Sequence, residues 1–170
     1  MKNLLMQVLI TASLLVSNIL HAQTLPNFDI IKMEQPADFK NAVPFVLQTA
    51  TYLLSAPIDK ENKDRLKSLQ FISKWMTGTT DYSFRLDEEV RKITKGDNDL
   101  LGIYMAAMTK FSLENKEASK DPKQVKLNSL ILLLNYCEKK ENNIRMNKSL
   151  KKLSDARKNN QLEQALDSAQ

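Results

Sequence analysis

The side chains of this sequence that could do chemistry are carboxylates that lie close to aromatic residues. The nearest cluster consists of Asp81, Asp87, Glu88 and Glu89. Two carboxyl groups, one protonated and one ionised, can cleave a glycosidic bond without a histidine, and nearby aromatic rings can stack on a sugar. The cluster therefore suggests a hydrolase acting on cell-wall glycan or polysaccharide. The alternative is that Glu88 and Glu89 simply decorate a solvated helix turn.

Histidine is almost missing, and this excludes several other kinds of chemistry. The only histidine, His21, ends a predicted export signal, so the mature protein would contain none. Catalytic triads and dyads that need histidine are excluded, and an ordinary zinc site is not expected. The sole cysteine, Cys137, follows an apolar run and is expected to be buried. We therefore expect no metal and no cofactor, and the residue types favour a protein that is not an enzyme.

The most distinctive segment, residues 75–84, is a candidate binding site. It holds the only tryptophan of the chain, a glycine, three threonines and two further aromatic residues. Aromatic anchors beside short hydroxyl side chains are typical of ligand and partner sites. The alternative is a structural corner that closes one end of a helical bundle, because large aromatic side chains usually belong to the core. The candidate binding residues are Trp75, Thr79, Asp81, Tyr82 and Phe84.

A second candidate surface is the basic region over residues 139–158. Its central cations are Lys148, Lys151 and Lys152. Such a face could contact acidic envelope polymers, anionic lipid or an acidic protein, although lysines opposite an apolar stripe are also the ordinary solvated side of a helix. No aromatic residues lie between the lysines to stack on bases, so a nucleic acid partner is not expected.

The N-terminus reads as a secretory signal peptide over residues 1–22. Lys2 precedes a mostly apolar stretch, and Ala22 provides a small residue for cleavage before Gln23. An uncleaved N-terminal anchor is the alternative. Removal of these 22 residues from 170 leaves 148, enough for one self-sufficient domain. No later apolar stretch is long enough to span a membrane, so we expect a periplasmic or secreted protein.

Composition predicts an all-α fold, a single helical-bundle domain of about five or six helices. Glycine occurs only three times, whereas small sheet-rich domains need more glycines in their turns. An extended lead-in over residues 23–40 is expected to precede the helical domain, residues 41–170. Periodicity and capping residues predict helices over residues 41–55, 59–77, 87–94, 98–118 and 122–139, then a helical hairpin over 146–168.

Three of these helices carry predictions about packing. The helix over residues 98–118 is apolar on nearly every face of its first half and belongs at the centre of the bundle, as does the helix over residues 122–139. Gly102 would let a neighbouring helix approach closely. The helix over residues 59–77 is expected to bury a stripe formed by Leu66, Leu69, Ile72 and Met76, widened by Phe71 and Trp75.

The chain also resembles a group of proteins. The signal ending at Ala22 and Gln23, the string WMTGTTDYSF and the string KGDNDLLGIYMAAMTKF are similar to small exported helical proteins of Bacteroidota bacteria. The resemblance implies an envelope or secreted location in a Gram-negative bacterium. It implies no activity and no catalytic residues.

These observations lead to one leading hypothesis and two alternatives. The leading hypothesis is an exported, non-enzymatic protein that binds an envelope protein or a small apolar ligand. The first alternative is the carboxylate-dependent hydrolase. The second is an assembly or chaperone-like helper that uses the basic C-terminal hairpin.

Overall fold

The computed structural model of the protein describes residues 24–167, and the predicted signal peptide, residues 1–22, lies outside the described residues. Within the described part, the chain forms seven α-helices, three short 3-10 turns and no strand. This confirms the all-α bundle, and the seven helices correspond to the five predicted ranges and the two arms of the predicted hairpin. The α-helices are α1 Pro36–Ser55, α2 Lys63–Gly78, α3 Glu88–Thr94, α4 Asn98–Glu114, α5 Pro122–Glu138, α6 Lys148–Lys158 and α7 Leu162–Asp167.

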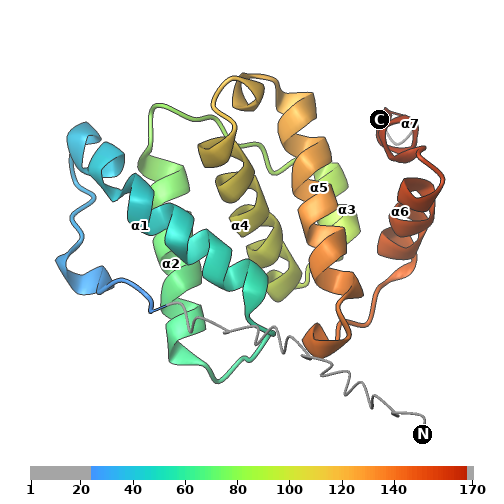
Figure 1. Ribbon diagram of the computed structural model, residues 1–170, viewed down its shortest axis with the longest axis horizontal. Coiled ribbons are helices and arrows are strands. Elements are labelled where there is room, and N and C mark those ends of the chain that lie inside the picture. The colour runs from blue at the N-terminus through green and yellow to red at the C-terminus, as the bar shows by residue number, and fades with distance from the viewer. Residues whose placement is uncertain (1–23, 168–170) are drawn as a thin grey trace, which may run out of the picture.

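The bundle is built around α4 (Figure 1). Helix α4 packs against α1, α2, α3 and α5, while α6 and α7 pack on α5 at the edge of the molecule. Buried residues occur on nearly all sides of α4, as the apolar first half of this helix predicts. One hydrophobic cluster lies between α4, α5 and the C-terminal helices, and a second lies between α1, α2 and α4. Helix α4 contributes buried side chains to both clusters.

Short polar side chains fix where most of the helices begin. In each case an Asn or Asp oxygen accepts a hydrogen bond from a backbone N–H of the first turn, which otherwise has no partner within the helix. Asp97, for example, accepts hydrogen bonds from the N–H groups of Asp99 and Leu100 at 2.9 and 3.1 Å. The caps of α2 to α6 are Asn62, Asp87, Asp97, Asp121 and Asn147.

Helix α1 begins five residues earlier than predicted, at Pro36 rather than residue 41. The Asp38 carboxylate accepts hydrogen bonds from the backbone N–H groups of Glu34 and Gln35, at 3.1 and 3.0 Å. Pro36 fits the first helical position because its missing N–H would have no helical partner there. These local contacts shorten the expected lead-in, which also contains the 3-10 turn η1, Phe28–Ile30.

Helix α2 buries most of the stripe predicted for it, with Phe71, Ile72 and Trp75 buried and Leu69 and Met76 half-buried against the core clusters. Its buried residues are Arg65, Ser68, Phe71, Ile72 and Trp75, whereas Leu66 is 47% exposed. The helix is therefore rotated so that its aromatic residues face α1 and the core. This rotation brings a charged side chain inside and leaves a leucine at the surface.

Arg65 is the charged side chain that this rotation buries, with only 2% of its surface exposed. Its Nη1 group donates to the carbonyl oxygen of Ala56 at 3.4 Å, and the Tyr136 hydroxyl donates to the same oxygen at 2.8 Å. The Nε and Nη2 groups have no hydrogen-bond partner within the described residues. Because Ala56 closes the C-terminal end of α1, the guanidinium also lies at the negative end of that helix dipole.

The C-terminal helices are fastened to α5 by a polar cluster. Glu138 near the end of α5 accepts a hydrogen bond from Ser154 at 2.6 Å and pairs with Arg157 at 2.5 Å. The Ser154 hydroxyl and the nearby cations hold the pKa of Glu138 below its ordinary value. None of the helices in residues 24–167 has both the length and the apolar character of a membrane span.

Candidate functional site

Trp75 lies in the core beneath the predicted binding segment. Its indole is completely buried, and its Nε1–H donates to the backbone oxygen of Phe39 at 2.9 Å. The ring centroid lies 5.6 Å from that of Tyr82 and 5.9 Å from that of Phe84. A ligand at this corner would therefore meet the outer edges of the segment and would not reach the indole.

The outer residues of the same corner form a shallow polar hollow. Asp81 is exposed and pairs with Lys40 at 3.7 Å, while Thr79 caps the end of α2. Tyr82 is half-buried, and burial, together with the Asp81 charge, raises the pKa of its hydroxyl. The hollow has a volume of about 580 Å³ and extends from Thr80–Ser83 to the surface around Lys116 and Lys120. Its lining is mixed in charge, with Asp81 and Glu117 beside Lys116 and Lys120.

Three different cations partner the four carboxylates of the predicted hydrolase site. Asp87 lies 3.1 Å from the ammonium group of Lys126 on α5, which also pairs with Glu89. The exposed Glu88 carboxylate lies 3.8 Å from Nε of Arg91. Asp81, as described above, pairs with Lys40. The structure thus brings Asp87 and Glu89 together through a shared lysine and directs the other two carboxylates elsewhere.

The Lys126 cluster favours the ionised form of Asp87. Burial alone would raise the pKa of Asp87, but the hydrogen bonds from the Val90 N–H and from Lys126 outweigh it and lower this pKa. Burial likewise would lower the pKa of Lys126, but its hydrogen bonds to the two carboxylates raise it. A glycosidase needs one carboxyl group with a raised pKa to act as the acid. Asp87 is shifted in the opposite direction.

Metal and thiol chemistry gain no support from the arrangement. Residues 24–167 contain no group of three or more His, Cys, Asp or Glu side chains placed to hold a metal ion. Cys137 is buried in the core, and burial raises the pKa of its thiol to about 12. A thiol with that pKa is protonated at neutral pH and is a poor nucleophile.

The basic surface predicted for the C-terminal hairpin lies on the outer side of α6. Lys148, Lys151 and Lys152 are all exposed, and none has an ion-pair partner within the described residues. The opposite side of α6 buries Leu150, Leu153 and Ser154 against the bundle. We call the three exposed side chains the α6 lysines.

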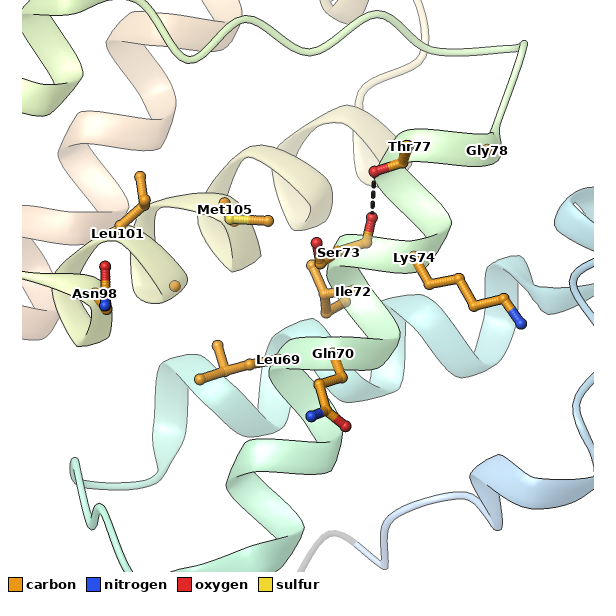
Figure 2. A pocket seen from close by; sticks show the side chains of 11 residues that line it. Leu69, Gln70, Ile72, Ser73, Lys74, Thr77, Gly78, Asn98, Leu101 and Met105 are labelled. Atoms are coloured by element: carbon orange, nitrogen blue, oxygen red, sulfur yellow. Dashed lines mark hydrogen bonds between the residues drawn. The ribbon is translucent and has the colours of Figure 1, made fainter.

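A mainly apolar hollow forms a groove between α2 and α4 (Figure 2). Its volume is about 650 Å³, and it is open to solvent. Figure 2 shows Leu101 and Met105 of α4 on one wall and Ser73 and Thr77 of α2 on the other. The lining residues are Leu69, Gln70, Ile72, Ser73, Lys74, Thr77, Gly78, Asn98, Leu101, Gly102 and Met105. We call this the α2–α4 groove.

A close contact between the two helices forms part of the lining of the α2–α4 groove. A Cβ atom at Gly102 would lie 2.5 Å from Cδ2 of Leu69, so the leucine can occupy this place only because residue 102 is glycine. The sequence signalled a close helix approach at Gly102 but did not identify the groove. It was missed because the rotation of α2 decides which side chains line it.

Comparison of the chain with protein-family models, with curated proteins and with solved structures finds no match.

Proposed function

We propose that this is an exported, non-enzymatic helical protein that binds another envelope protein through the α2–α4 groove. The groove itself is the observation that carries the proposal, because it is a mainly apolar hollow of about 650 Å³ left open at the surface. Continuous apolar surface that a folded domain leaves open is typical of interaction sites. Export is supported by the signal-like sequence of residues 1–22.

The shape of the groove favours a protein partner over a small apolar ligand. Pockets for small molecules enclose most of the ligand surface. Here Gln70, Ser73 and Thr77 on the α2 side are exposed, so a small apolar molecule would remain partly in water. A protein segment covers the groove with its own polar outer face and avoids that cost.

The hydrolase remains the second candidate, and the contacts of its carboxylates speak against it. Asp81, Asp87, Glu88 and Glu89 all lie within ion-pair distance of a lysine or an arginine. The pKa of Asp87 is lowered, as expected for a structural carboxylate and not for a catalytic acid.

The test captures proteins from the envelope of the producing organism after mild crosslinking. It compares the wild type with a variant in which a large side chain blocks the groove. Ser73→Trp places a large side chain on an exposed position of the groove wall, where the serine side chain makes no hydrogen bond among the described residues. Ser55→Trp is the matched control, because Ser55 is exposed at the end of α1 and lines none of the hollows described above.

We expect one protein to be retained in stoichiometric amount by the wild type and by Ser55→Trp, and to be lost from Ser73→Trp. Equal retention by Ser73→Trp would refute the groove as the binding site. The hydrolase would be favoured if the wild type retained glycan fragments in place of a protein. The pure wild type would then also have to cleave that glycan into smaller sugars.

A further inference from the structure

A row of lysines follows the α2 side of the groove. Lys63, Lys67, Gln70 and Lys74 are spaced four, three and four residues apart, so they share one face of α2. Gln70 and Lys74 line the groove, and the row therefore runs along its outer edge. Figure 2 shows the Lys74 side chain extending from α2 on the side away from α4. We call Lys63, Lys67 and Lys74 the α2 lysine row.

The charges of this row are not neutralised by the domain itself. All three lysines are exposed, and none forms an ion pair within residues 24–167. Other lysines that lie beside acidic residues, such as Lys60, Lys110 and Lys126, do form such pairs. The groove is thus flanked on one side by uncompensated positive charge.

The apolar surface beside the row has the length of a short helix. Leu66, which is 47% exposed, precedes Leu69 by three residues and extends the apolar lining toward the start of α2. From Leu66 to Thr77 the helix axis rises by about 17 Å, or roughly three turns. A partner helix of that length presents apolar side chains at positions i, i+3 or i+4, and i+7 to such a groove.

We propose that the occupant of the α2–α4 groove is an amphipathic helix of a partner protein with acidic residues along one edge. Its apolar stripe lies on Leu69, Leu101 and Met105, and its acidic edge faces the α2 lysine row. This inference rests on the function proposed above and adds the chemistry of the partner. Opposite charges along the edge fix the direction and register of the helix in the groove.

The experiment uses two labelled helical peptides of fourteen residues that carry the same leucine stripe. One has glutamates along one edge, and the other has lysines at the same positions. Fluorescence anisotropy measures their binding to the wild type at low salt. We expect the glutamate peptide to bind about tenfold more tightly, the combined effect of three exposed charge pairs.

Two variants of equal net charge separate the groove from general electrostatics. In the first, the α2 lysine row is changed to glutamate, and in the second the α6 lysines are changed to glutamate. We expect the first variant to reverse the peptide preference and the second to retain it. Ser73→Trp is expected to abolish binding of both peptides.

Three outcomes would overturn the inference. If the two peptides bind equally and Ser73→Trp abolishes the binding of both, the groove binds helices but does not select acidic residues. If the glutamate variants of the α2 lysine row and of the α6 lysines weaken the preference for the glutamate peptide equally, the preference reflects net charge alone. Binding of neither peptide at millimolar concentration would exclude a helix as the occupant. The proposed function is tested separately, by the proteins that wild type and Ser73→Trp retain from the envelope.

Discussion

Replacing the buried arginine of α2 by an apolar side chain should stabilise the protein. Arg65 is 2% exposed, and two of its nitrogen groups have no hydrogen-bond partner within the described residues. Arg65→Met keeps an unbranched side chain of similar length and removes the buried charge. We expect the free energy of unfolding of the variant to exceed that of the wild type.

The magnitude follows from the contacts that are gained and lost. Each buried N–H group without a partner costs about 1–3 kcal/mol, so the two groups together cost about 2–6 kcal/mol. The lost hydrogen bond to Ala56 is long, at 3.4 Å, and belongs at the low end of the range of about 1.5–3 kcal/mol for charged groups. The lost attraction to the C-terminal end of α1 is worth about 0.3–2 kcal/mol. The midpoints of these ranges leave a net gain of about 1 kcal/mol, or a rise in Tm of roughly 2–4 °C.

Urea unfolding followed by the fluorescence of Trp75 measures this change, since it is the only tryptophan and is completely buried. Tyr136→Phe provides the control, because its hydroxyl is the other donor to the Ala56 oxygen. We expect this substitution to cost about 1 kcal/mol in the wild type and more in Arg65→Met, where the carbonyl loses its last side-chain donor. A loss of more than 1 kcal/mol in Arg65→Met itself would refute the reasoning and show that the guanidinium has a partner in solution.

Two further predictions concern the ion pairs of Lys126 and the buried thiol of Cys137. Lys126→Met leaves Asp87 and Glu89 without their shared cation and should destabilise the protein by about 2 kcal/mol at pH 7, less than the cost of breaking a fully buried pair because Asp87 is half-exposed. Because the pKa of Asp87 is lowered in the folded protein, its contribution is present above the ordinary carboxyl pKa and is lost as the pH falls through the lower folded value. The difference between wild type and Lys126→Met should therefore shrink in unfolding experiments below about pH 4, and a constant difference down to pH 2 would contradict the assignment. Cys137, whose pKa is raised to about 12, should react with iodoacetamide at pH 8 only after urea unfolds the protein; rapid labelling of the folded chain would contradict its burial.

Local sequence patterns were enough to predict the helical fold and most helix boundaries. Scarce glycine, long apolar periods and capping residues such as Asp97 act within a few residues, so a sequence contains all the information they need. The same holds for the central position of α4, which follows from apolar residues on all its sides. Where a local contact was overlooked, as with Asp38 at the start of α1, the boundary shifted by five residues.

The candidate site depended on interactions between elements, and only the tertiary structure decided it. The leucines of α2 predicted that Leu66 faces the core, but packing of Trp75 against Phe39, Tyr82 and Phe84 turned the helix and exposed Leu66 instead. That rotation buried Arg65 and placed the α2 lysine row beside the groove. Of the predicted acidic cluster, only Asp87 and Glu89 share a cation, Lys126 of α5, whereas Asp81 and Glu88 pair with other residues. A period of 3.6 residues shows that a helix has an apolar side, but the neighbours that fit against it determine which side is buried.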